Sequence, residues 1–517
     1  MATLSLISLL LLLGTPVLVV LYRIFFHKLS GIPGPKLAAA TNLHQALQYV
    51  VGRWEESEYQ IKLHKKYGPI VRYGPNTVIV NLPHELPTIY HRRADKSEWY
   101  SVRFGIPAVL TTLNHADHML ARRRIAQAYS MTAIKPFEED IDERIKEWQT
   151  ELESRFCAAG GTQALKFHEA INFLAYDIVT EIAFGESLGF VRKWSDHRRL
   201  INSYEGSIPR ALGRTPLLSN IVRALGIYRP TDKIGLGVLI ASVSSVFQLL
   251  LSFLFLMFPS FITQPPDFEL TFGSRFLAWR GKDGSTMTAE EVKFESITAM
   301  VAGSRNIAEA ISPFVLNVLR APGCYQRLRR ELEDGEIMGL LGSPTGVVPF
   351  ETASSDRLPY FTACLQEGMR ISATPVQMPR VSPPGGMQLA HDGKTTFIPA
   401  GAAVSSSSRL IALNEGLYGP DARDFRPERW LEASAETLKR WETYNLRWGY
   451  GTRTCIGKHL AVMEIYKICL QVSTTSTTNS TDGPGMPHEM HNPNQILLTM
   501  STKGTDAPLL LAVLPAV

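Results

Sequence analysis

The spacing of apolar and polar residues predicts a chain built mainly from helices. Apolar residues recur every three or four positions in seven segments: 54–66, 136–153, 164–184, 288–320, 325–334, 358–371 and 456–470. Short runs typical of β-strands occur at 69–72, 76–81 and 395–398. No Pro/Ser-rich linker divides residues 37–470, so we expect one large, mainly α domain with small β-sheets, within a unit that spans 37–517.

The N-terminus is apolar and uncharged from Ala2 to Leu21. Such a helix is about 30 Å long, enough to cross a bilayer, and we expect residues 1–22 to be a transmembrane anchor. The alternative, a cleaved signal peptide, is disfavoured because no basic residue precedes the run and no small-residue cleavage site follows it. The basic residues that come next lie in 23–36, a Pro/Gly-rich hinge, and they predict a single-pass protein of the endoplasmic reticulum membrane that faces the cytosol.

Two segments differ from the rest of the chain. Residues 234–262 carry no charge and are rich in Leu and Phe, which fits a buried helix or a second membrane span. After Gln471 the chain turns to Ser and Thr and then to Gly, Pro and Asn, which favours a disordered end. Both segments contain Val-Ser, at Val243-Ser244 and at Val472-Ser473, the dipeptide that an in-frame 5′ splice site encodes, so 234–266 and 472–517 can be read as translated introns.

Composition excludes several classes of protein. The formal net charge is +5 in 517 residues, with no dense Lys/Arg stripe, which argues against nucleic acid as a partner. The five cysteines form no disulfide framework and have no zinc-site spacing. A single cysteine in a special setting is therefore the candidate for chemistry.

That setting is the segment from Trp448 to Gly457, which contains Cys455. A cysteine that binds a metal must be a thiolate, and the start of the following helix would stabilise its charge. Gly449, Gly451 and Gly457 would let the backbone turn tightly and approach a flat macrocycle. Arg453 is placed to pair with a carboxylate of such a ligand.

This segment resembles the haem-binding signature of the cytochrome P450 superfamily, with Trp448 in the aromatic position. The resemblance extends over roughly residues 28–470 and is greatest to the fungal secondary-metabolism branch. It implies the P450 fold, heme b with its iron held by Cys455, and oxidation of a lipophilic small molecule. Dioxygen and a membrane-bound, NADPH-dependent flavoprotein reductase would take part in that reaction.

Other segments match the family residue by residue. Glu367 and Arg370 lie one helical turn apart, and with Arg429 they correspond to the family's buried triad, whose role would be structural. The family's propionate-binding positions are matched by His118, Arg122 and Arg380, although the helix with His118 could equally present a solvated basic face.

One segment departs from the family pattern. Where the family carries an acid and an alcohol that relay protons during oxygen activation, the segment Ala302–Ile307 has Gly303 followed by Arg305 and Asn306. We treat these three as the candidate catalytic residues; Arg305 could hold an anionic substrate, pair with Glu309 or point away from the haem. The departure leaves two alternatives to a monooxygenase: a haem-thiolate isomerase or dehydratase that needs no reductase, or an inert haem-binding product of a faulty gene model.

Overall fold

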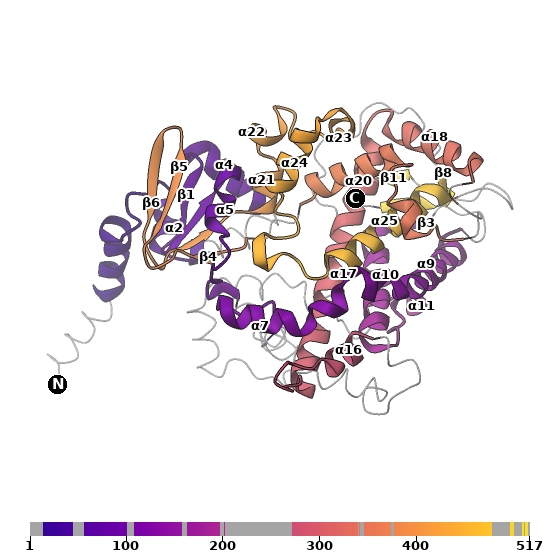
Figure 1. Ribbon diagram of the computed structural model, residues 1–517. Helices are drawn as coiled ribbons and strands as arrows, with labels where there is room; N and C mark the ends of the chain where they lie inside the picture. The colour runs from indigo at the N-terminus through magenta and orange to yellow at the C-terminus, as the bar shows by residue number, and fades with distance from the viewer. Residues whose placement is uncertain are drawn as a thin grey trace, which may run out of the picture.

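A single long helix, α17 (Ala289–Arg320), runs through the middle of the molecule (Figure 1). The computed structural model describes residues 14–44, 56–100, 108–157, 163–196, 201, 271–339, 341, 346–373, 377–477, 497–500, 509–510 and 512–514. A capping box starts α17: Thr288 Oγ1 accepts from the Glu291 N–H (3.2 Å), and the Glu291 carboxylate accepts from the Thr288 N–H (2.8 Å).

Three long helices pack against α17: α10 (Phe167–Phe184), α20 (Pro359–Ile371) and α25 (Lys458–Thr475). Small residues allow this close approach. A Cβ added at Gly303 would lie 2.9 Å from Val179 Cγ2, and one added at Gly368 would lie 3.2 Å from Phe314 Cα. The apolar side chains between these helices form the larger of the hydrophobic cores.

Shorter helices surround this centre. On the N-terminal side they are α2 (Lys36–Ala40), α4 (Glu56–Tyr67), α5 (Leu86–Ile89), α7 (His115–Ile125), α8 (Met131–Ile134), α9 (Glu138–Leu152) and α11 (Phe190–Lys193). After residue 270 they are α16 (Phe272–Ala278), α18 (Cys324–Ile337), α19 (Phe350–Ala353), α21 (Ser408–Ala412), α22 (Glu415–Tyr418), α23 (Glu428–Glu432) and α24 (Ala435–Thr443).

The larger sheet lies at the end of the molecule that carries the N-terminus (Figure 1). Its strand order is β1 (Ile70–Gly74), β2 (Thr77–Val80), β7 (Ala403–Ser405), β4 (Arg380–Val381), and β2 and β7 are parallel. The hairpin of β5 (Met387–His391) and β6 (Lys394–Ile398) lies beside it. The predicted fold class, mainly α with small β-sheets, is confirmed.

Most predicted elements are present within one to three residues of their predicted ends. The exceptions have tertiary causes. Residues 164–166 were predicted as the start of a helix but belong to the strand β3 (Gln163–Lys166), because they pair with the distant strand β9 (Leu497–Met500). The helix α7, which carries part of the candidate site, was absent from the helices that periodicity predicts and was expected only from the family resemblance.

The expectation of a disordered tail after Gln471 is wrong for the described residues. Helix α25 continues to Thr475, and β8 (Ser476–Thr477) pairs with β10 (Leu509–Leu510). Strand β9 lies between β3 and β11 (Ala512–Leu514) in a three-stranded sheet. Part of the tail thus belongs to the fold, whereas the segment 234–266 lies outside the described residues.

The predicted hinge is in part packed against the domain. Leu29 is fully buried, and the Arg72 N–H donates to the Pro33 carbonyl (2.7 Å). A Cβ at Gly34 would lie 2.3 Å from the Arg72 carbonyl oxygen, so only glycine fits there. Residues 1–13 of the predicted anchor are outside the described residues, and from residue 14 onward no described helix is long and apolar enough to span a membrane.

Candidate functional site

The loop before α25 folds back on itself, and Cys455 is among its solvent-exposed residues, although many protein atoms surround its thiol. The Cys455 N–H donates to the Trp448 carbonyl (2.6 Å), which closes the loop. Two of its glycines have conformations that favour glycine, with φ of 79° at Gly449 and 61° at Gly451. A Cβ at Gly457 would meet only Tyr129 Cε1, at 3.9 Å, so close packing does not require glycine there in the described structure.

Different groups around Cys455 shift the pKa of its thiol in opposite directions. Burial by the loop raises the pKa of the Cys455 thiol, while the Gly457 N–H and the charges of Arg122 and Lys458 lower it. The N-terminus of the 18-residue helix α25 begins three residues later, where its dipole favours a negative charge. A bound metal ion would add a positive charge that favours the thiolate further.

Five basic side chains from separate parts of the chain are gathered near this loop. Four were predicted: His118 and Arg122 on α7, Arg380 on β4, and Arg453 in the loop. The fifth, Lys96, was missed. Their donors contact uncharged acceptors: Arg122 donates to the Thr454 carbonyl (2.7 Å), Arg380 to the Tyr100 hydroxyl (3.3 Å), Arg453 to the carbonyls of Thr112 (2.8 Å) and Leu113 (2.7 Å), and Lys96 to the Leu110 carbonyl.

Within the described part of the chain, none of these five groups forms an ion pair with a carboxylate. The charges of these groups affect one another. Burial, together with the charges of Arg453, Arg380 and Arg122, lowers the pKa of Lys96 to about 6. Burial and the same kind of repulsion lower the pKa of His118 to about 3, so its imidazole is neutral. Buried His118 Nδ1 and Arg453 Nε have no hydrogen-bond partner.

These residues fit a haem. Cys455 lies just before a helix, and three arginines with no carboxylate partner among the described residues favour an anion nearby, as two propionates would provide. The predicted set His118, Arg122, Arg380 and Arg453 is therefore brought together. Trp448, Gly449, Gly451 and Gly457 belong to the same loop as Cys455. Sequence contains no local signal for Lys96, because its neighbours come from β4, α7 and the loop.

In the middle of α17, Ala302 and Asn306 are exposed. Asn306 Nδ2 donates to the Ala302 carbonyl (2.8 Å), so the amide keeps its second N–H and its oxygen. Arg305 pairs with Glu309, one turn on, with Nε and Oε1 2.6 Å apart and both side chains mostly buried. Of the three alternatives for Arg305, the ion pair with Glu309 is confirmed. Gly303 packs against Val179 on α10, where it allows the two helices to approach closely.

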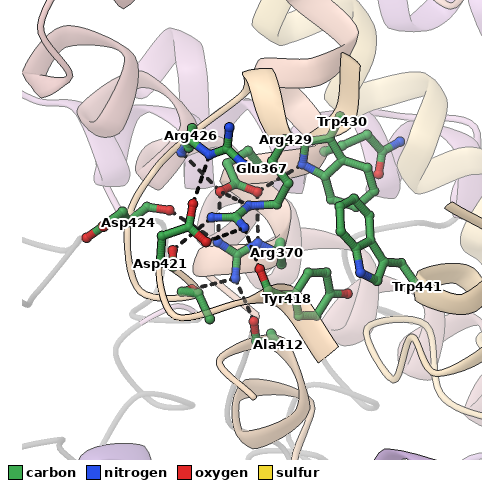
Figure 2. Close-up of polar contacts among 12 residues, drawn as sticks. Glu367, Arg370, Ala412, Tyr418, Asp421, Asp424, Arg426, Arg429, Trp430 and Trp441 are labelled. Atoms are coloured by element: carbon green, nitrogen blue, oxygen red, sulfur yellow. Dashed lines mark hydrogen bonds and ion pairs between the residues drawn. The ribbon is translucent and has the colours of Figure 1, made fainter. Parts of the chain in front are cut away.

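The predicted triad is present (Figure 2). Arg370 donates to both Glu367 oxygens (2.8 Å each), and Arg429 Nε donates to Oε1 (3.2 Å). All three side chains are at most 2% exposed. The sequence did not reveal that the Arg426 N–H (3.0 Å) and the Trp430 indole N–H (2.9 Å) also donate to this carboxylate.

Comparisons with known proteins agree with this geometry. Residues 264–493 match the family model of cytochrome P450. The quiannulatic acid synthase of Emericella variicolor is 30% identical over 463 residues, and the cytochrome P450 monooxygenase gsfF of Penicillium aethiopicum is 29% identical over 467; each alignment covers 86% of both chains. Among solved structures, retinoic acid-bound cyanobacterial CYP120A1 superimposes with a TM-score of 0.63 at 19% identity, over 83% of this chain and 89% of that one, a likeness in fold.

Proposed function

The chain belongs to the cytochrome P450 family, whose haem is held by a cysteine thiolate, and on that premise we propose that it oxidises a lipophilic small molecule of fungal secondary metabolism. Its curated relatives are cytochrome P450 monooxygenases, and it is an oxygen-incorporating oxidoreductase. The observation that carries the proposal is the solvent-exposed residue Cys455, just before α25, beside five basic groups that form no ion pair with a carboxylate among the described residues.

In this proposal Cys455 would bind the iron, and Arg122, Arg380, Arg453, His118 and Lys96 would hold the propionates. The haem, when bound, supplies the activation of dioxygen. Two buried atoms, His118 Nδ1 and Arg453 Nε, have no partner among the described residues and are available as hydrogen-bonding groups. Burial, together with repulsion from the three arginines, lowers the pKa of Lys96, and two bound carboxylates would offset that repulsion.

On α17 the exposed amide of Asn306 takes the position of the family's alcohol. Like a hydroxyl, it satisfies a backbone carbonyl one turn back and still offers a donor and an acceptor to a water molecule. Arg305 cannot act as an acid, and its charge is neutralised by Glu309. We therefore propose that Asn306 holds the water from which protons are delivered, less efficiently than an acid and an alcohol together would.

We further propose that electrons come from an NADPH-dependent flavoprotein reductase with an acidic docking face. The intermediate-to-exposed basic residues Lys458 and His459 follow directly on the cysteine loop, which makes them suited to such a partner. Both proteins would then share the endoplasmic reticulum membrane. Exposed apolar residues near the N-terminus support this: Leu18 is 66% and Phe26 76% exposed, more apolar surface than a segment in water normally shows.

The test begins with the reduced, CO-bound protein. If Cys455 is the ligand, this form shows the red-shifted Soret band of a thiolate-ligated haem, and Cys455→Ser or Cys455→His abolishes the band. Survival of the band in either variant contradicts the assignment. Cys469, a fully buried cysteine on α25, provides the control: Cys469→Ala should leave the band unchanged.

The same preparation separates the alternatives. Product formation that requires NADPH and the reductase supports a monooxygenase. Turnover of a substrate without NADPH would identify a haem-thiolate isomerase or dehydratase. Haem uptake without turnover of any substrate would identify the inert haem-binding product of a faulty gene model.

A further inference from the structure

The segment from Ala108 to Leu113, just before α7, is fastened from two sides. On one side Arg453 donates to the carbonyls of Thr112 and Leu113, and Lys96 donates to the Leu110 carbonyl. On the other side the Val109 N–H donates to Glu295 Oε1 of α17, at 2.7 Å. The segment therefore bridges the cysteine loop and α17.

Glu295 lies on a particular face of α17. It precedes Ala302 by seven residues and Asn306 by eleven, spacings that return to nearly the same side of a helix with about 100° per residue. Because Ala302 and Asn306 are exposed, we call this side the open face of α17. Glu295 lies on the same side of the helix but is buried, with 6% of it exposed, beneath the segment 108–113. The distance along the helix from Ala302 is about 10 Å.

The carboxyl of Glu295 is costly to bury. Burial is the main cause that raises the pKa of Glu295 to about 7, against the opposing effects of the Val109 N–H and of Lys96. No ion pair with it is found among the described residues, and an apolar residue of similar size would fill the same space at lower cost. Unlike an apolar residue, the Glu295 carboxyl accepts a hydrogen bond from the Val109 N–H.

We propose that Glu295 is a positioning residue that holds the segment 108–113 against α17 and so limits how quickly a ligand reaches the open face. The inference rests on the proposed function, since the open face is where that function puts the haem and its ligand. Without Glu295 the segment stays attached to Lys96 and Arg453 but is released from α17. Its far side can then move away from the helix while the propionate-binding cations remain in place.

Two variants of the full-length holoenzyme test this. Glu295→Leu keeps the volume and removes the acceptor, whereas Glu295→Gln keeps an acceptor oxygen for Val109. Glu290→Gln, at an exposed residue in the first turn of α17, is the control. The two readouts are hydrogen–deuterium exchange of the peptide that contains Val109 and the association rate of imidazole with the ferric haem.

In Glu295→Leu, exchange at the Val109 amide should rise about tenfold, the factor that corresponds to one lost hydrogen bond, and imidazole should associate several-fold faster. Glu295→Gln and Glu290→Gln should stay within about twofold of the unmodified protein, well under the effect of a lost bond. If Glu295→Leu loses its haem, Glu295→Asp takes its place, because its shorter side chain does not reach Val109.

The proposal is overturned if Glu295→Leu, or Glu295→Asp in its place, changes neither the exchange of the Val109 amide nor the association rate of imidazole. It is also overturned if Glu295→Gln changes both as much as the variant that lacks the contact. The proposed function fails separately: if the unmodified protein gives no thiolate-type CO spectrum, the assignment of the haem site is wrong. The exchange measurement on Val109 still reports on the contact with Glu295 in that case.

Discussion

Glu367 is the residue whose loss should damage this protein most, because one buried carboxylate accepts five hydrogen bonds. Two come from Arg370, one from Arg429, and the others from the Arg426 backbone and the Trp430 indole (Figure 2). Replacing Glu367 with Ala removes the acceptor for all of them. The donors sit on α20 and on the segment that includes α23, so the contact joins two parts of the chain that are about sixty residues apart.

The structure indicates where the cost arises. Arg429 would keep the Asp421 carboxylate at 2.9 Å. Arg370, 1% exposed, would keep the carbonyls of Ala412 (2.6 Å) and Ala422 (2.7 Å) but no carboxylate among the described residues. Breaking a buried ion pair by removing one partner costs about 3–5 kcal/mol. A domain is stabilised by about 5–15 kcal/mol in total, so the variant should retain little stability.

Urea unfolding and haem content measure this effect. Glu367→Ala should express poorly and lose haem, instead of giving a folded enzyme with altered turnover. The matched control is Glu333→Ala on α18, where Glu333 is 54% exposed and lies 3.3 Å from Arg329; a surface pair of this kind contributes about 0–1 kcal/mol. A Glu367→Ala protein that is as stable and as fully loaded with haem as Glu333→Ala would refute the reasoning.

Three further outcomes are expected. Removing residues 1–22 should move the protein from the membrane fraction towards the soluble fraction; a truncated protein that resists alkaline wash would point to 234–262 as a second span. Arg305→Asp combined with Asn306→Thr should raise the fraction of NADPH electrons that reach product, measured against peroxide release; lower coupling than in the unmodified protein would show that the native pair is an adaptation. Burial raises the pKa of Glu367. The opposing effects of Arg370, the Arg426 N–H and Arg429 are larger together, and they hold this pKa below its ordinary value. The ionised Glu367 should therefore stabilise the fold above the ordinary carboxyl pKa range, and this stabilisation should be lost as pH falls through the lowered pKa. The unfolding free energies of the unmodified protein and of Glu367→Gln should accordingly become more similar in acid. A difference between them that does not change with pH would contradict this.

The cysteine loop could be predicted from sequence because its constraints are local. The positive φ at Gly449 and Gly451 and the hydrogen bond from Cys455 to Trp448 all fall within eight residues. Glu367 and Arg370 were likewise readable as neighbours on one helix face. Arg429 entered only through the family resemblance, since nothing in the sequence relates it to a carboxylate sixty-two residues away.

Long-range contacts account for what the sequence did not reveal. Lys96 looks like any surface lysine, and its burial depends on the residues that surround it from other elements. Glu295 meets a backbone N–H that lies 186 residues earlier. Strand β3 was taken for helix because its partner β9 lies more than three hundred residues later, and strand propensity depends on such pairing more than on local preference.

Arg305 shows how a departure from a family motif can be absorbed locally. A lone guanidinium beside a lipophilic pocket would demand an anion and would favour an anionic substrate. Glu309, one turn on, supplies that anion at 2.6 Å, and the spacing of four residues makes the pair a property of the helix itself. The open face of α17 is then left with a methyl group at Ala302 and a neutral amide at Asn306. Such a surface favours an uncharged ligand, because a charged one would lose its hydration without gaining a counter-charge there. The substitution that removes the family's acid thus leaves this face of α17 suited to an uncharged ligand, in keeping with the lipophilic substrate that we propose.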